Sequence, residues 1–307
     1  NTRIFKMKYG YLEDVSGIDF QLPEAPLFSR KYLKGEKASQ PSIYIGSSVW
    51  SDKDFKGNFY PEKTPQKNFL KEYSKQFNTV EVNATRYGTP RTSTLNTWKS
   101  NVPEGFKFCF KMPQIITQRK NLLALDVLER LEQFILAMDS MDGKLGTTFI
   151  LLQNNFNKER LYELRGFLEQ LPVSQKFAIE VRNSNFNQSE AFCDLLHEFN
   201  ISNVITDTAG ERSIIHKTVT SNSAFIRFVG NGLIETDYNR INAWIDQIEI
   251  WVNQGVNEFF FLHHQPNQAR RLSGFAAKYM IDQINLRLPN LKIKSPNDYS
   301  SITSSEN

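Results

Sequence analysis

The chain has 307 residues, of which 40% are hydrophobic and 23% are charged. This composition is typical of a globular protein and excludes disordered, collagen-like and coiled-coil classes. The net charge of +4 is smaller than a dedicated duplex-DNA-binding protein would carry. Two cysteines, Cys109 and Cys193, without a Cys-x-x-Cys spacing indicate a reducing compartment. Since the sequence has neither a signal-peptide pattern nor a long apolar run, we expect a cytoplasmic protein without a membrane partner.

The two ends of the chain lack a regular hydrophobic pattern. Residues 1–42 are interrupted by Pro23, Pro26, Gly35 and Pro41, and they predict an irregular N-terminal extension. Residues 289–307 are polar and rich in serine, which predicts a disordered C-terminal tail. The main domain is therefore expected over residues 43–288.

Within this domain, short apolar or β-branched runs recur and predict eight strands. They cover residues 43–48, 79–84, 106–111, 147–153, 176–182, 203–207, 224–230 and 258–264. Most are followed by a segment with helical periodicity, such as the stripe Ile241, Trp244, Ile245, Ile248 and Trp251. Residues 208–222 show no helical pattern and predict a loop.

Eight alternating strands and helices predict parallel strands joined by right-handed crossovers. A domain of this length is close to the roughly 250 residues of a (β/α)8 TIM barrel. The alternative is a doubly wound open sheet, but Gly46-Ser47-Ser48-Val49-Trp50 lacks the glycine pattern of its nucleotide-cofactor loop. We therefore predict a (β/α)8 barrel with an irregular N-terminal extension.

Polar side chains stand near the carboxyl end of every predicted strand, which is where barrel enzymes place their chemistry. Glu81 and Asn83 share one face of their strand, as do Glu180 and Arg182, because side chains alternate along a strand. We predict catalytic roles for one set of these residues: Glu81, Lys111, Glu180, Asp207 and His263. We predict substrate binding by a second set: Ser48, Trp50, Asn83, Tyr87, Gln153, Arg182, Arg227 and His264.

Three kinds of chemistry remain open for these groups. Glu81, Glu180, Asp207 and His263 could hold a divalent metal. Alternatively, a buried glutamate and Lys111 could act as acid and base, or Lys111 could form a Schiff base. Phosphate could bind at the turn after the seventh strand and the start of the last helix, through Gly230, Gly232, Arg270 and Arg271. A structural ion-pair layer is the alternative to catalysis.

The chain resembles the Domain of Unknown Function 72 family, also called YecE-like, from about residue 43 to about residue 285. The resemblance implies a (β/α)8 barrel and a shared pocket. It is carried by Ile45-Gly46-Ser47-Ser48-Val49-Trp50-Ser51, Gly57-Asn58-Phe59-Tyr60-Pro61, Phe77-Asn78-Thr79-Val80-Glu81-Val82-Asn83-Ala84-Thr85-Arg86-Tyr87, Phe108-Cys109-Phe110-Lys111-Met112-Pro113 with Ile116-Thr117, and Glu180-Val181-Arg182.

The chain departs from this family where histidine is common, since it has Gln118, Asn183 and Val229 there. Conversely, His263-His264 stand where the family more often has paired asparagines. We expect an enzyme for a phosphorylated or polyhydroxylated substrate, such as a sugar phosphate, a nucleotide or a phosphodiester. The alternative is a non-catalytic protein that binds nucleic acid or another ligand.

Overall fold

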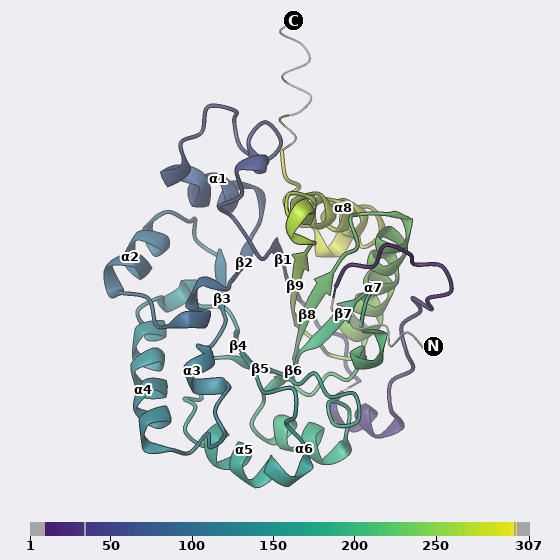
Figure 1. Cartoon of the computed structure of the whole chain (residues 1–307). Coiled ribbons are helices and arrows are strands. Elements are labelled where there is room, and N and C mark those ends of the chain that lie inside the picture. Colours follow the sequence, from purple (N-terminus) through teal and green to yellow (C-terminus); the bar gives the residue numbers. More distant parts are fainter. Residues whose placement is uncertain (1–9, 34, 298, 300–307) are drawn as a thin grey trace, which may run out of the picture.

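The computed structural model describes residues 10–33, 35–297 and 299. Figure 1 shows strands around a common centre with helices outside them. The strands are β1 Ser42–Ser47, β2 Thr79–Val82, β3 Lys107–Phe110, β4 Thr148–Leu151, β5 Phe177–Glu180, β6 Ser202–Asn203, β7 Ile205–Thr208, β8 Ser223–Val229 and β9 Glu258–His264. The helices are α1 Phe69–Gln76, α2 Thr92–Ser100, α3 Gln114–Thr117, α4 Leu125–Asp139, α5 Leu161–Leu168, α6 Glu190–Glu198, α7 Glu235–Asn253 and α8 Leu272–Arg287.

The strands form two parallel sheets, with the orders β3-β2-β1-β9-β8-β7 and β4-β5-β6. The prediction is thus confirmed as an α/β fold with parallel strands, but the strands do not form one closed sheet. Between β3 and β4 there are only isolated bridges, such as Lys111 to Phe149. The strand predicted over 203–207 is interrupted at Val204, so that β6 and β7 belong to different sheets. No helix in the described part of the chain has the length and hydrophobicity needed to cross a bilayer.

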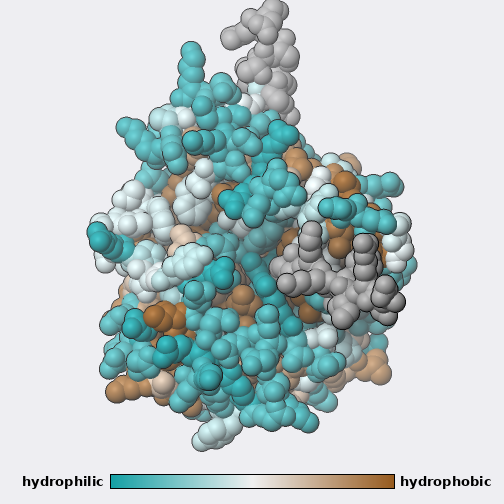
Figure 2. Space-filling model, viewed as in Figure 1, coloured by the Kyte–Doolittle hydropathy of each residue, from teal (hydrophilic) through white to brown (hydrophobic). Residues whose placement is uncertain are grey.

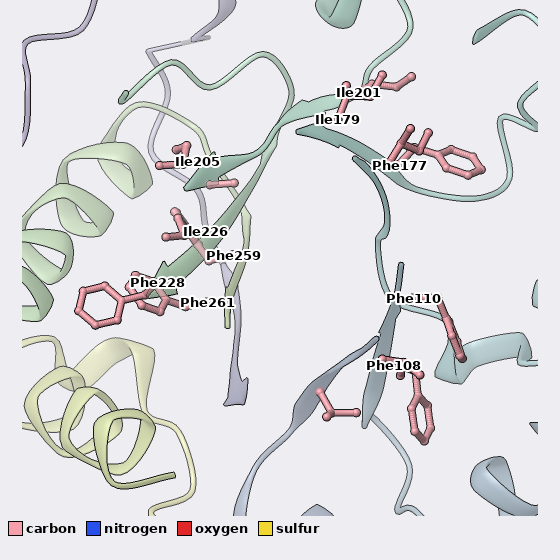
Figure 3. Close-up of a cluster of buried hydrophobic side chains, with 14 of the residues drawn as sticks. Phe108, Phe110, Phe177, Ile179, Ile201, Ile205, Ile226, Phe228, Phe259 and Phe261 are labelled. Atoms are coloured by element: carbon pink, nitrogen blue, oxygen red, sulfur yellow. The ribbon is translucent and has the colours of Figure 1, made fainter. Parts of the chain in front are cut away.

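Side chains alternate between two apolar environments along the strands. One set points outward to the helices, as Figure 3 shows for Phe228 and Phe261 on one side and Phe108 and Phe110 on the other. The opposite set forms a smaller inner cluster that contacts both sheets, since the rings of Phe149 and Phe225 lie 5.7 Å apart. The inner cluster consists of Cys109, Phe149, Ala178, Val204, Phe225, Phe260 and Leu262, with Tyr44 packed against it.

The motif at β1 has a packing reason. A Cβ at Gly46 would come within 1.9 Å of the Thr79 carbonyl oxygen, so only glycine allows this approach. The close approach lets Tyr73 of α1 tie the two strands together: its hydroxyl accepts from Ser47 N (2.7 Å) and donates to Thr79 O (2.9 Å). This arrangement holds Ser48 and Glu81 at the same edge of the sheet.

The segments outside the predicted main domain pack on it where the structure describes them. Leu12 exchanges two hydrogen bonds with Asn231, and Tyr32 donates to Asp194 of α6 (2.7 Å). In the predicted disordered tail, residues 289–291 form a short 3-10 helix, and Asn297 N donates to Gln76 Oε1 (2.7 Å). Residues 1–9, 34, 298 and 300–307 lie outside the described residues, so the irregular extension and the disordered tail stay predictions there.

Candidate functional site

The candidate site stands directly above the inner cluster, at the carboxyl ends of the strands. Glu180, Arg227 and His264 each follow an inner-cluster residue by two positions, and Lys111 follows Cys109 in the same way. Because side chains alternate with a period of two, these polar groups point to the same interior as the apolar layer below them. Glu81 joins them, since it pairs in register with Cys109 on β3.

Arg227 is the centre of a buried ion-pair cluster and bridges the two glutamates. Its Nε and Nη2 donate to Glu81 Oε2 (2.9 Å) and Oε1 (2.8 Å), and its Nη1 donates to Glu180 Oε2 (2.6 Å). Arg182 Nε donates to the other oxygen of Glu180 (2.6 Å). Asn83 Nδ2 and His264 Nε2 complete the cluster at Glu81, at 2.8 and 2.9 Å. Each oxygen of Glu81 therefore has two partners.

Both glutamates stay charged in spite of their burial. Burial by itself raises the pKa of Glu81, but the charge of Arg227 and the hydrogen bond from His264 outweigh it and hold the pKa well below 4.5. Burial opposes ionisation of Glu180 in the same way, and Arg227 and Arg182 lower its pKa to about 2. The saturated, ionised Glu81 makes His264 Nε2 the hydrogen-bond donor, which leaves Nδ1 as the acceptor in the neutral ring.

Lys111 differs from its neighbours in lacking such partners. Lys111 is only 8% exposed, yet its amino group makes no hydrogen bond or ion pair with the residues that the structure describes. The contact it does make is with the ring of Phe149, 5.6 Å from its centroid. Burial lowers the pKa of Lys111 to about 8, and the charge of Arg227 adds to this, against the opposing charges of Glu180 and Glu81.

A cavity of about 340 Å³ opens above this cluster. Its lining includes Ser48, Asn83, Lys111, His264, Tyr87 and Arg270, all of which the sequence predicted, and also residues that it missed: Val49, Arg86, Gln265, Asn267 and Ser273. Figure 2 shows a largely hydrophilic surface over the common centre of the strands. A larger cavity of about 710 Å³ lies at the opposite end of the strands, around Ser42 and Glu104, and contains none of the predicted site residues.

Asp207 lies outside this site, because its side chain points toward α7. It accepts hydrogen bonds from Arg240 (2.7 Å) and Trp244 Nε1 (2.7 Å), and it pairs with Arg212. Burial disfavours its charge, but Arg240 and Arg212 keep its pKa below the usual 3.8. Arg212 also donates to carbonyl oxygens of residues 19–21, so Asp207 organises the contact between β7, α7 and the N-terminal extension.

His263 also points away from the cavity, and its neighbour His264 takes the inward position. The ring of His263 is fully buried between Phe228 and Phe261, at centroid distances of 5.5 and 4.9 Å. Neither ring nitrogen has a hydrogen-bond partner among the described residues. Burial, together with the neighbouring His264, lowers the pKa of His263 to about 3, so the ring is neutral.

We expect His263→Leu to raise the free energy of unfolding by about 1–2 kcal/mol, since it removes two unsatisfied polar atoms from an apolar site. The pKa of His263 is about 3 in the folded protein and 6.5 in the unfolded chain, so protonation of the unfolded chain destabilises the unchanged protein as the pH falls below 6.5. The variant lacks this loss, and its advantage in stability should therefore grow as the pH falls from 6.5. Urea unfolding at several pH values measures it. His264→Leu is the matched control and should destabilise the protein; equal effects of the two variants would contradict the assignment.

The predicted phosphate loop after β8 already has its amide donors occupied. Asn231 N (2.7 Å) and Leu233 N (2.9 Å) both donate to Asp237 Oδ2, and Gly232 N donates to Gln265 Oε1 (2.8 Å). A Cβ at Gly230 would come 2.1 Å from Gln265 Nε2, so this glycine serves close packing. A carboxylate of the chain itself thus binds where a phosphate was predicted.

The remaining predicted residues are dispersed. Trp50 packs edge-to-face on Trp98 (5.5 Å), against the hydrophobic cluster between the strands and the helices. Gln153 accepts a hydrogen bond from Arg160 and donates one to the Gln118 carbonyl. Arg271 lines a separate cavity beside Tyr238, while Arg270 lines the candidate site. Arg86 lies in the stretch that ends at Tyr87 and carries the family resemblance, which is the signal that could have found it. Its guanidinium lies over the exposed ring of Tyr87, 5.5 Å from the ring centroid.

The residues proposed as metal ligands do not fit a metal centre. Arg227 separates Glu81 from Glu180 and bonds to both, while Asp207 and His263 face the helices. Within residues 10–33, 35–297 and 299, no three histidine, cysteine, aspartate or glutamate side chains come together as a metal would require.

Fold and site together define an α/β protein of parallel strands with a buried ion-pair cluster below a polar cavity. The chain belongs to the family described as "Protein of unknown function DUF72", whose model matches residues 44–298. It is similar to the UPF0759 protein YecE of Escherichia coli K12, with 25% identity over 244 residues, which is 72% of this chain and 86% of that protein. The UPF0759 protein YunF of Bacillus subtilis is 36% identical over 75 residues, 24% of this chain and 26% of YunF.

Two crystal structures share the fold. A DUF72 family protein of Enterococcus faecalis matches with a TM-score of 0.62 and 18% identity, covering 79% of this chain and 98% of that protein. A DUF72 family protein of Thermotoga maritima matches with a TM-score of 0.62 and 20% identity, covering 80% of this chain and 99% of that protein. At these identities the likeness establishes the fold alone.

Proposed function

We propose that this protein is an enzyme that acts on a small phosphorylated or polyhydroxylated molecule by acid–base chemistry, with Lys111 and His264 as the proton-transferring groups. The observation that carries the proposal is Lys111, a lysine that is nine-tenths buried, lines a cavity and has no bonded acceptor among the described residues. A lysine with a pKa of about 8 exchanges its proton near neutral pH, as a general acid or base must.

His264, which lines the same cavity, supports this role. Its Nε2 is held by the ionised Glu81 at 2.9 Å, and its ring is partly exposed and lines the same cavity. A carboxylate that orients an imidazole through one nitrogen leaves the other to accept and return a proton. Glu81 and Glu180 then act as positioning residues, because their oxygens are engaged by Arg227.

The charge of the cavity favours an anionic substrate. Lys111, Arg86 and Arg270 line it, whereas the described lining includes no carboxylate. A positive, partly enclosed cavity concentrates anions, and a guanidinium matches a phosphate by two parallel hydrogen bonds. A volume of about 340 Å³ suits a small molecule better than a nucleic-acid strand.

We also infer that the six-stranded and the three-stranded sheet together form one (β/α)8 barrel. Support comes from the bridge Lys111–Phe149, which links the ends of β3 and β4, and from Val204, which joins β6 to β7 in the chain and whose N–H donates to Ile179 O of β5 (2.9 Å). The inner cluster draws on both sheets, as the interior of a barrel does. The buried, unpaired Cys109 and Cys193 support the predicted cytoplasmic location.

The neighbouring pair Arg270 and Arg271 tests the function. Titration of the full chain with glycerol phosphate in a calorimeter should show binding, and Arg270→Gln should weaken it about tenfold, since a charge-assisted hydrogen bond contributes about 1.5 kcal/mol. Arg271→Gln is the control and should bind as the unchanged protein does, because Arg271 lines another cavity. Absence of binding, or equal losses in both variants, would overturn the anionic-substrate proposal.

A further inference from the structure

The amino group of Lys111 occupies an environment that favours a nucleophile over an ion-pair partner. Its residue is 8% exposed, and its described surroundings offer it an aromatic ring at 5.6 Å and no bonded acceptor. A buried ammonium without acceptors is unfavourable, whereas a neutral amine loses much less on burial. Burial accordingly lowers the pKa of Lys111 to about 8, so the lone pair is available near neutral pH.

The carboxylates that could accept a hydrogen bond from Lys111 already accept hydrogen bonds from other side chains. Glu81 takes hydrogen bonds from Arg227, Asn83 and His264, and Glu180 takes them from Arg227 and Arg182. The bidentate arginine therefore neutralises the carboxylates and leaves the lysine unbound. In a purely structural ion-pair layer the lysine would bond to a glutamate, whereas here Arg227 pairs with both glutamates in its place.

The same cavity holds the two other groups that carbonyl chemistry needs. His264, oriented by Glu81, can accept and return protons through its second nitrogen. Arg270 and Arg86 line the cavity with positive charge, which suits an anionic group of the ligand.

We propose that Lys111 is a covalent catalyst that forms an imine with the carbonyl carbon of a phosphorylated aldehyde or ketone. This inference rests on the proposed function and names its substrate class.

The step balances without an oxidant or reductant. The lone pair of Lys111 Nζ forms a bond to the carbonyl carbon, and the carbonyl oxygen takes up a proton to give a carbinolamine. The carbinolamine hydroxyl then leaves as water with a second proton while the nitrogen lone pair forms the C=N bond. His264 carries both transfers: it takes each of the two protons that the nitrogen loses and passes the first to the carbonyl oxygen and the second to the departing hydroxyl, so that a neutral imine and one water form and His264 ends in its starting state.

Reductive trapping tests the inference on the full, unmodified chain. The protein is incubated at pH 8 with glyceraldehyde 3-phosphate or with unphosphorylated glyceraldehyde. Sodium borohydride is then added, which delivers hydride to the imine carbon and leaves a stable secondary amine. Peptide mass spectrometry locates the adduct. At pH 8 about half of the Lys111 side chains are neutral, whereas a lysine with the ordinary pKa of 10.5 is almost entirely protonated. We therefore expect at least about tenfold more phosphorylated adduct on Lys111 than on any exposed lysine.

Two variants and a competitor sharpen the result. Lys111→Arg keeps the charge and should abolish the dominant adduct. Lys107→Met changes a lysine at the opposite end of the same strand, beside another cavity, and should leave the adduct unchanged. Inorganic phosphate in excess should reduce labelling of Lys111 by the phosphorylated aldehyde.

The outcomes separate this inference from the proposed function. If glycerol phosphate binds in an Arg270-dependent manner but the adducts are spread evenly over the exposed lysines, the imine is refuted while the binding site stands. If Lys111 is trapped equally by both aldehydes and phosphate does not compete, the nucleophile stands and the phosphorylated substrate class is refuted. If the adducts are spread evenly over the exposed lysines and glycerol phosphate does not bind, both the imine and the proposed function are refuted.

Discussion

We expect Arg227→Met to lower the free energy of unfolding by about 3–5 kcal/mol, the usual effect of removing one partner from a buried ion pair. Arg227 is 6% exposed and bonds both Glu81 and Glu180, which are 0% and 1% exposed. Without the guanidinium, Glu81 loses two of its four hydrogen bonds and Glu180 loses one, and neither carboxylate can reach water. Urea unfolding followed by circular dichroism measures the loss.

The exposed pair Arg165–Glu198 provides the control. It has the same two-bond geometry, with both distances at 2.6 Å, but its side chains are 41% and 55% exposed. Arg165→Met should therefore cost less than about 1 kcal/mol. Should Arg227→Met fail to fold, Arg227→Lys keeps one charge and should show an intermediate loss. Similar small losses for Arg165→Met and either Arg227 variant would contradict the central role of Arg227.

The destabilisation should also depend on pH. In the unchanged protein the pKa of Glu180 is about 2 and that of Glu81 lies well below 4.5, so their ionisation contributes stability above pH 4.5 that is lost as the pH falls. In Arg227→Met the attraction is gone and burial raises both pKa values, so the variant loses stability as the pH rises. The difference between the two proteins should therefore widen with pH above about 2.

Asp207→Asn is the second large effect that we expect, a loss of about 3 kcal/mol or more. The substitution leaves Arg240, which is 1% exposed, without its main counter-charge and places an amide donor among guanidinium and indole donors. Calorimetric unfolding measures the loss. Binding of glycerol phosphate should stay unchanged wherever the variant is folded, because Asp207 faces α7. If Asp207→Asn instead weakens the binding of glycerol phosphate without lowering the stability, Asp207 belongs to the functional site.

Much of the fold follows from local pattern, and the strand runs around Glu81, Glu180, Arg227 and His264 all lie where periodicity predicts them. The pairing of Glu81 with Asn83 and of Glu180 with Arg182 on common faces follows from alternation alone. Helix α2 could not be predicted from periodicity, because Leu95 is its one buried residue and it therefore has no apolar stripe. The stripe of α7, by contrast, contains Arg240 among Ile241 and Trp244, a signal that a buried carboxylate such as Asp207 faces this helix.

The sequence by itself determined an α/β protein of parallel strands, the family, and a set of charged residues at one end of the strands. Only the tertiary structure decided which of them meet. Alternation states that two adjacent histidines face opposite ways, but the register of β9 against β1 and β8 decides that His264 faces inward and His263 outward. The occupied amides after β8 and the separation of Arg270 from Arg271 are likewise contacts between distant segments. A period-two pattern is local, whereas the choice of the inner face depends on which strands pair across the whole chain.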